Sequence, residues 1–286
     1  MGEATEGVEQ MVRPAALPRD LVPRAFSAAV LAVVALTGNW AGPVPFAILV
    51  LAIAVVMSWE WSRIVRGGAL DAALLVQGSV AAAAVVLTAW GAPHWAVALV
   101  LAGTMAVLAI APRPNVMLSA LGVSYVGLPA VAMVWLRSGD ASGAAAIFFI
   151  FAIVWTTDTF AYICGRLIGG PKLWPALSPG KTWSGSLGGF AFAALAGAAC
   201  AVLLPPTAPL ALAVVAVCLS IVSQIGDLAE SALKRAFAVK NASDLIPGHG
   251  GFMDRMDGVV TAASMAAVLA AMRGVHSPAQ ALLYWP

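Results

Sequence analysis

The sequence predicts an all-α membrane protein, a polytopic bundle of about nine transmembrane helices with a polar site at one membrane face. Of its 286 residues, 62% are hydrophobic and only 10% are charged, whereas a soluble domain carries about 25% charged residues. Most apolar runs are about 16–21 residues long, which suits helices that cross a hydrocarbon core of roughly 30 Å. These runs lack the residue-by-residue alternation of membrane β-strands.

Nine apolar segments account for most of the chain, and Pro and Gly residues mark most connections between them. The polar stretch 1–24 precedes the first apolar segment. No small-residue cleavage site follows that segment, so we expect the segment to be retained as the first helix. The predicted spans are residues 25–41, 44–59, 72–90, 95–111, 116–136, 143–163, 186–204, 209–228 and 257–273.

Polar residues are concentrated after residue 155, which predicts a scaffold region followed by a catalytic region. We expect a cytoplasmic N-terminal segment at 1–24 and scaffold helices at 25–136. A C-terminal transmembrane region at 143–273 would carry the catalytic residues, and 274–286 would form a short tail.

The basic residues predict the orientation of the bundle. With the N-terminus inside, only Arg137 and Arg273 of the 15 Lys and Arg residues fall on the outer side. The positive-inside rule therefore favours N-in, C-out, which requires an odd number of spans. The long polar connections 164–185 and 229–256 then share the cytoplasmic side, where they can build one site.

The segment 224–258 is the most informative part of this apolar chain, because it holds a dense cluster of charges of both signs. Asp227, Glu230, Ser231 and Lys234 are spaced i, i+3, i+4 and i+7, so a continuous eighth helix presents all four on one face. Charged groups are costly in a membrane, which favours a functional site. Salt bridges at a helix end are the alternative explanation.

Two further motifs in the same segment suit an anionic ligand. Three glycines surround His249 in the run 247–251, and backbone N–H groups in such loops can bind phosphate. Asp254 and Asp257 lie at i, i+3 if the ninth helix begins there, and paired carboxylates facing a phosphate substrate are typical of a Mg²⁺ site. The ordinary explanation of the glycine run is a flexible turn, and that of the two carboxylates is capping of a helix N-terminus.

A second polar block lies at 158–185. Asp158 is embedded in an apolar helix, so we expect it to face the protein interior. Lys181 and Thr182 end a Ser-Pro-Gly-Lys-Thr run that resembles the end of a phosphate-binding loop, although the upstream glycine spacing is absent. Lys181 could hold a phosphate or belong to an ordinary basic connection. Glu60 and Arg63 are interpreted as a structural ion pair at the membrane interface.

In this order, the polar residues resemble the C-terminal signature of the phosphatidate cytidylyltransferase family, also called CDP-diacylglycerol synthases. The departures are Asn241, where the signature has Asp, and Ser184, where many members have Glu. The upstream matches are Asp158, Ala161, Tyr162, Gly165, Arg166 and the run 178–183. The signature matches are Ser231, Leu233, Lys234, Arg235, Lys240, Ser243, Ile246, Pro247, His249, Gly250, Gly251, Phe252, Asp254, Arg255, Met256 and Asp257.

The resemblance implies transfer of the cytidylyl group of CTP to phosphatidic acid in phospholipid biosynthesis, at a bacterial inner membrane with the site facing the cytoplasm. It implies Mg²⁺ held by Asp227, Asp254 and Asp257, which act in catalysis with Lys234 and Arg235. A monovalent cation and a homodimer are left open, and no nucleic acid partner is expected. The implied substrate-binding residues are Asp158, Arg166, Ser178, Lys181, Thr182, Ser231, Lys240, His249, Gly250, Gly251 and Arg255.

Two other functions were weighed against this one. A secondary transporter also carries intramembrane acids and interrupted helices, but it would place them near the midplane in mirrored halves. A CDP-alcohol phosphotransferase would use CDP-diacylglycerol rather than make it, and the acidic pattern expected of that class is missing.

Overall fold

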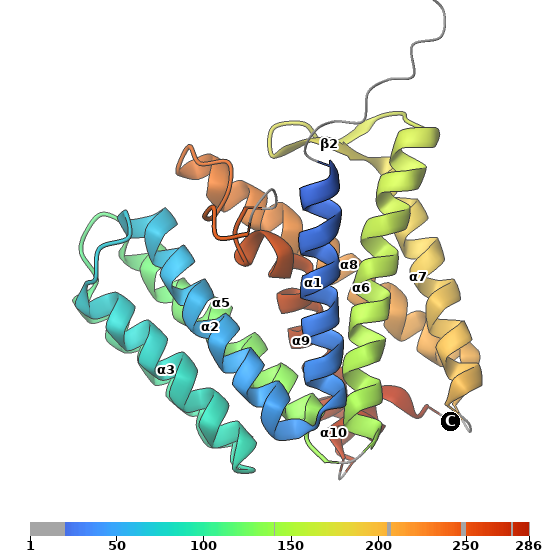
Figure 1. Cartoon of the computed structure of the whole chain (residues 1–286), viewed down its shortest axis with the longest axis horizontal. Helices are drawn as coiled ribbons and strands as arrows, with labels where there is room; N and C mark the ends of the chain where they lie inside the picture. The colour runs from blue at the N-terminus through green and yellow to red at the C-terminus, as the bar shows by residue number, and fades with distance from the viewer. Residues whose placement is uncertain (1–20, 140, 205–206, 247–249, 276, 286) are drawn as a thin grey trace, which may run out of the picture.

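The computed structural model describes residues 21–139, 141–204, 207–246, 250–275 and 277–285, and it confirms an all-α bundle (Figure 1). In this part of the chain, eight helices are long and apolar enough to cross a membrane. They are α2 (Pro43–Arg66), α3 (Ala72–Ala89), α4 (Pro93–Ile110), α5 (Val116–Arg137), α6 (Ala141–Leu167), α7 (Trp183–Leu203), α8 (Pro209–Ala236) and α9 (Met253–Arg273).

The first predicted span corresponds to helix α1 (Leu21–Trp40). Its apolar stretch, Phe26–Trp40, is shorter than the other eight, so a ninth membrane crossing stays a prediction. In Figure 1 the hairpin that contains β2 lies at the same end of the bundle as the start of α1, while the chain ends near α10 at the opposite end. The start of α1 and the end of the chain therefore lie at opposite ends of the bundle, and the orientation N-in, C-out stays a prediction.

Proline and glycine set the limits of several helices, as the sequence predicts. Pro43, Pro93 and Pro209 occupy the first turn of α2, α4 and α8, where the missing N–H would have no intrahelical partner. Gly67 and Gly274 end α2 and α9 in the left-handed conformation, which glycine adopts without steric cost.

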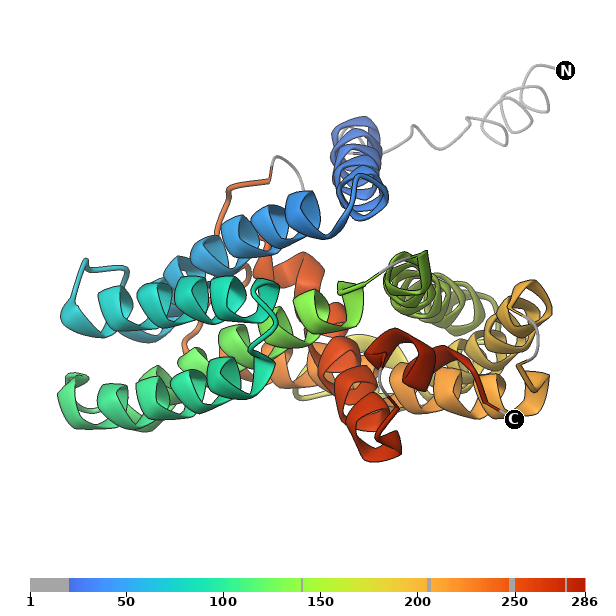
Figure 2. The same cartoon turned by 90° about the horizontal axis from the view of Figure 1, so that it is seen from below.

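The helices pack as two groups joined by α9. Helices α3, α4 and α5 enclose a small apolar core of their own, while a larger core involves α2 and α5 through α9. Figure 2 shows α2 through α5 on one side, α6 and α7 on the other, and α9 between them. Helix α9 contacts both α5 and α8, so its position links the scaffold to the polar half of the chain.

The connection between α6 and α7 forms a small antiparallel hairpin, which the all-α prediction missed. Strand β1 (Lys172–Trp174) pairs with β2 (Ser178–Thr182), with Lys172 opposite Thr182. These strands have only three and five residues, which is too short to show the apolar alternation by which strands are recognised. The hairpin projects from the bundle end where α7 begins (Figure 1).

The predicted tail contains a tenth helix, α10 (Pro278–Leu283), which packs into the larger core. Its Leu282 and Leu283 are fully buried. Arg273 at the end of α9 donates to the carbonyls of Ala281 and Tyr284 at 2.6 and 2.9 Å. The C-terminal segment is therefore an integral part of the fold.

The burial of α10 predicts that Leu282→Ala destabilises the protein. Truncating a fully buried leucine leaves a cavity and costs about 2–5 kcal/mol, so the thermal midpoint in detergent should fall clearly. Leu210→Ala is the matched control, because Leu210 is 78% exposed at the start of α8. Equal midpoints for the two variants would contradict the packing of α10.

Candidate functional site

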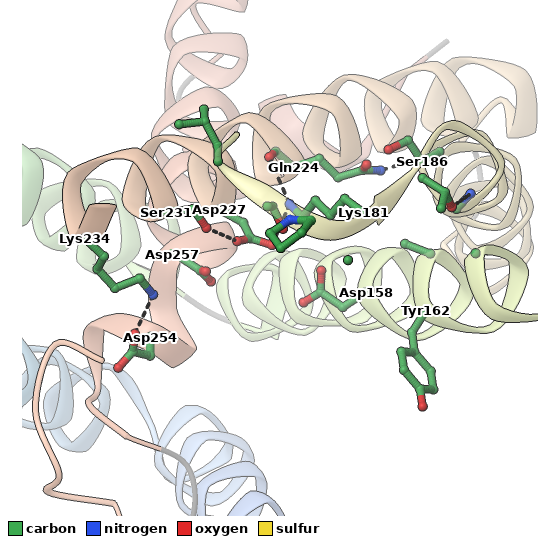
Figure 3. Close-up of a pocket in the computed structure, with 18 of the residues that line it drawn as sticks. Asp158, Tyr162, Lys181, Ser186, Gln224, Asp227, Ser231, Lys234, Asp254 and Asp257 are labelled. Atoms are coloured by element: carbon green, nitrogen blue, oxygen red, sulfur yellow. Dashed lines mark hydrogen bonds and ion pairs between the residues drawn. The ribbon is translucent and has the colours of Figure 1, made fainter. Parts of the chain in front are cut away.

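A polar cavity of about 900 Å³ opens between the hairpin, the end of α6 and the facing ends of α8 and α9 (Figure 3). Both long polar connections contribute to its wall, as the sequence predicts. Its charged lining comprises Asp158, Arg166, Lys172, Lys181, Asp227, Lys234, Arg235, Lys240, Asp254, Arg255 and Asp257.

Helix α8 presents its predicted polar face to this cavity. It continues to Ala236, two turns beyond Asp227, so Asp227, Ser231 and Lys234 all line the wall. Asp227 Oδ2 lies 2.6 Å from Lys181 Nζ on the hairpin, and Ser231 Oγ is 3.5 Å from Asp227 Oδ1. Lys181 Nζ also lies 3.5 Å from the Gln224 carbonyl. The hairpin is thereby joined to α8 across the cavity.

Lys234 forms the second ion-pair cluster of the site. Its Nζ lies 2.6 Å from Asp254 Oδ1 and 3.2 Å from Glu230 Oε1. The Glu230 side chain is fully buried. The sequence analysis placed Glu230 on the polar face but assigned it no role, and its burial beside Lys234 makes it part of the site's charge balance. Together Lys181 and Lys234 pair with three carboxylates at the cavity.

Close packing of α8 against α9 brings two carboxylates to the cavity wall. Gly226 precedes Asp227, and a Cβ at Gly226 would collide with Thr261 Oγ1 and the Asp257 carbonyl of α9. Gly258 follows Asp257, and a Cβ there would lie 2.6 Å from Ser223 Oγ of α8. Small residues allow helix backbones to approach closely within a membrane. The two aspartates are therefore positioned by the glycines beside them.

The start of α9 is held by its own second residue. Asp254 Oδ2 accepts hydrogen bonds from the N–H groups of Ala242 and Gly251, at 2.9 and 2.8 Å. Asp257 Oδ1 accepts from Gly258 N at 2.7 Å. Both carboxylates line the cavity, with Asp254 also bound to Lys234. The predicted i, i+3 pair exists, and Asp254 organises the loop as well.

Helix α6 supplies the opposite wall. Asp158 lies on this side, facing Lys181 and Asp227 across the cavity (Figure 3). Two turns further along the helix, Arg166 Nη1 donates to Tyr162 Oη at 2.7 Å, and both side chains are exposed. Arg166 is thus held at the open end of the cavity by a residue of its own helix.

The hairpin places the other predicted residues of the second polar block. Ser178, Lys181 and Thr182 all line the cavity. Thr182 is buried and caps α7, because its Oγ1 accepts from Gly185 N at 3.1 Å. Ser184, one of the two departures from the family signature, donates to the Gly169 carbonyl and so ties α7 to the end of α6.

The described glycines of the loop donate hydrogen bonds within the protein. His249 lies outside the described residues, and Gly250 and Gly251 are absent from the cavity lining. Gly250 N donates to Ile246 O, and Gly251 N donates to Asp254. Gly250 N thus bonds within the loop and Gly251 N bonds to the first turn of α9, and a role of these glycines in binding phosphate stays a prediction.

Exposed basic residues surround the cavity near its opening. Arg235 and Lys240 follow the polar face of α8, and Arg255 lies at the start of α9. All three are exposed. Their position suits them to meet a polyanion that enters from water, since clustered positive charge raises the local concentration of anions.

The environment of Glu60 differs from the ion pair with Arg63 that the sequence analysis predicted. Instead of pairing with Arg63 at the interface, Glu60 is fully buried, and it accepts hydrogen bonds from Ser243 Oγ and from Phe252 N and Met253 N. Arg63 lies over the Trp59 ring, 5.7 Å from its centre. The available signal was a carboxylate between two tryptophans inside an apolar span, where an unpaired acid is costly.

No ready metal site of three ligands exists in residues 21–139, 141–204, 207–246, 250–275 and 277–285. The predicted ligands Asp227, Asp254 and Asp257 line one cavity, but Lys181 and Lys234 neutralise two of them in this structure. The three-carboxylate set therefore stays a prediction.

An apolar groove of about 760 Å³ adjoins the polar cavity. Side chains of α1, α2, α5, α6 and α9 line it, among them Ala32, Phe46 and Met133. Four residues line both spaces: Asp158, Asp254, Arg255 and Asp257. The site thus has one polar and one apolar compartment that meet at these carboxylates.

Comparison with known proteins agrees with this architecture. Residues 22–272 match the model of a family described as the cytidylyltransferase family. A Brucella abortus protein named phosphatidate cytidylyltransferase is 38% identical over 253 residues, which cover 86% of this chain and 92% of the relative. A Staphylococcus epidermidis protein of the same name is 40% identical over 146 residues, 48% of this chain and 52% of the relative. The match across nearly all the membrane helices shows that this chain belongs to the cytidylyltransferase family.

Proposed function

We propose that this protein transfers the cytidylyl group of CTP to phosphatidic acid, giving CDP-diacylglycerol and pyrophosphate. The observation that carries the proposal is the wall shared by the polar cavity and the apolar groove. A water-soluble triphosphate suits the first compartment, and the acyl chains of a membrane lipid suit the second. The family and the names of the relatives support the same reaction.

The reaction needs charge neutralisation more than a covalent intermediate on the protein. An oxygen of the lipid phosphate attacks the α-phosphorus of CTP, forming the new P–O–P linkage. The bond from the α-phosphorus to the oxygen that bridges to the β-phosphorus breaks, and pyrophosphate leaves with that oxygen. Both reactants are anions, so catalysis depends on positioning them in line and on stabilising the charge that develops.

The basic residues of the cavity are assigned to the two substrates by position. We assign Arg235, Lys240 and Lys181, with Ser178, to the triphosphate, because these residues lie near the water-exposed opening. Arg255 lines the groove as well as the cavity, so it is placed to contact the lipid phosphate. Lys234 would turn from Asp254 to a phosphate when substrate enters.

The carboxylates fit a divalent cation. Lys181 pairs with Asp227, and Lys234 is shared by Asp254 and Glu230, so buried negative charge exceeds its paired positive charge. Glu230 Oε1 is 3.2 Å from Lys234 Nζ, which it shares with Asp254. Mg²⁺ prefers such oxygen ligands and would neutralise the substrate phosphates when bound. We propose Asp227 and Asp257 as its ligands, joined by Asp254 once Lys234 releases it.

We further propose that the polar cavity faces the cytoplasm of a bacterial inner membrane. The cavity lies at the bundle end that holds 13 of the 15 basic residues in the predicted topology, which supports this orientation through the positive-inside rule. CTP would then enter from the cytoplasm, and phosphatidic acid would enter from the bilayer.

The reaction itself is tested by measuring both products with detergent-purified protein. Pyrophosphate and CDP-diacylglycerol should appear in equal amounts, and only when CTP, phosphatidic acid and Mg²⁺ are all present. Folded protein without turnover across several lipids and cations would overturn the proposal. Solute movement in sealed vesicles without consumption of CTP would instead support a transporter.

Replacing Asp257 by Asn should lower kcat by about 10²- to 10³-fold, the usual effect of removing one group that stabilises transition-state charge. Asn is close in size, so expression and membrane insertion should stay at the level of the unmodified protein. Asp244→Asn is the control, because Asp244 is exposed and outside the cavity lining. Near-normal turnover of the Asp257 variant would refute its assignment.

Filling the apolar groove should weaken lipid binding selectively. Ala32→Phe places a ring where acyl chains would lie. Displacing one or two methylenes, at about 0.8 kcal/mol each, raises KM for phosphatidic acid about four- to fifteenfold. KM for CTP should not change. Ala29→Phe is the matched control, because Ala29 is exposed on α1 and lies outside the groove lining. Equal lipid KM values for the two variants would place the acyl chains elsewhere.

A further inference from the structure

Glu60 is a buried carboxylate that belongs to the N-terminal scaffold but bonds to the loop beside the cavity. It lies in α2 and is fully buried, whereas the described residues that line the polar cavity lie between 158 and 257. Its hydrogen bonds span 183 to 193 residues of sequence. Such a contact needs an explanation, because an unpaired carboxylate is costly inside a membrane protein.

The Glu60 carboxylate supplies the missing N-terminal cap of α9. No side chain at the cap position, Phe252, bonds to the first turn. Glu60 Oε1 instead accepts from Phe252 N at 2.9 Å, and Oε2 accepts from Met253 N at 2.7 Å. These are N–H groups that a helix start leaves without partners. The negative charge also lies at the positive end of the helix dipole.

The same carboxylate holds the other arm of the loop. Ser243 is buried and donates its hydroxyl to Glu60 Oε1, while its Oγ accepts from Leu245 N at 3.3 Å. The two arms, which end at Ile246 and begin again at Gly250, are joined to each other by the Ile246–Gly250 bridge. Glu60 therefore fixes both arms to α2.

Glu60 also accounts for the glycine at position 251. A Cβ on Gly251 would lie 2.9 Å from Glu60 Cδ and closer still to Oε1. Only a residue without a side chain leaves room for the carboxylate. Gly251 N then donates to Asp254, so the contact of Glu60 with the loop continues directly into the carboxylates of the cavity.

We infer that Glu60 is a positioning residue for the cytidylyl-transfer site, fixing where α9 begins so that Asp254 and Asp257 face the cavity. Asp254 is the second residue of α9 and Asp257 the fifth, so a shift of the helix start would move both relative to Lys234. The catalytic part of this inference rests on the proposed function. With this role for Glu60, the scaffold helix α2 helps to position the carboxylates of the cavity.

The test is Glu60→Gln, which keeps the size of the side chain but turns one acceptor into a donor that faces an N–H donor. We expect kcat to fall about ten- to hundredfold, since a misplacement of about 1 Å can cost about 10²-fold. KM for CTP and for phosphatidic acid should change far less. Amide exchange in residues 250–257, followed by mass spectrometry, should become faster.

Leu282→Ala is the control for lost stability alone, because Leu282 is buried in α10, outside the cavity lining. It should lower the thermal midpoint while keeping kcat and the exchange of residues 250–257 unchanged at temperatures well below that midpoint. A Glu60→Gln variant that behaves like Leu282→Ala would overturn the positioning role.

Two further outcomes are decided by the same measurements. If Glu60→Gln does not fold, Ser243→Ala removes one of the three hydrogen bonds that Glu60 accepts from the described residues. It should show the same two changes at smaller size, and unchanged kcat and exchange would refute the inference. If the unmodified protein shows no cytidylyl transfer, the proposed function fails. The exchange comparison then still decides whether Glu60 fixes the start of α9.

Discussion

The close approach of α8 and α9 is the constraint on which the rest of the structure depends. Gly226 and Gly258 leave no room for side chains between these helices, and each lies beside an aspartate of the cavity. Dispersion and close packing, rather than water exclusion, drive association of helices within lipid. Because the helix contact and the site use adjacent residues, the geometry that holds the bundle together also sets the distance between its carboxylates.

Charge inside an apolar bundle then determines how the neighbouring elements are arranged. The hairpin is joined to α8 by Lys181, and the loop before α9 is held by Lys234, Asp254 and Glu60. Each of these charged side chains has a hydrogen-bond or ion-pair partner, without which its burial would be costly. Substrate anions would compete for the same lysines, so the ion pairs of this structure can be exchanged for contacts with phosphate.

The sequence was sufficient to predict whatever depends on local spacing or composition. The apolar runs predicted the helices, and the i, i+3, i+4, i+7 spacing predicted the polar face of α8 because helix geometry alone determines it. The hairpin was missed because its strands, with three and five residues, are too short to show a period. The Glu60 contact was misread because its partners lie 183 to 193 residues away, and the residues around Glu60 do not identify those partners. The partners of the Gly250 and Gly251 N–H groups, Ile246 O and Asp254 Oδ2, likewise depend on how the loop folds against α9.

The shared wall between the polar cavity and the apolar groove places one reaction between two solvents. The concentration of a ligand that binds in the cavity is an amount per volume of water, whereas the concentration of a ligand that binds in the groove is an amount per area of bilayer. The rate of such an enzyme would therefore follow the mole fraction of its lipid in the membrane, and dilution of that lipid by other lipids would slow it at constant total amount. The two products would also leave into different phases. Pyrophosphate would diffuse into water and CDP-diacylglycerol would diffuse laterally into the bilayer, so their exit routes would not overlap.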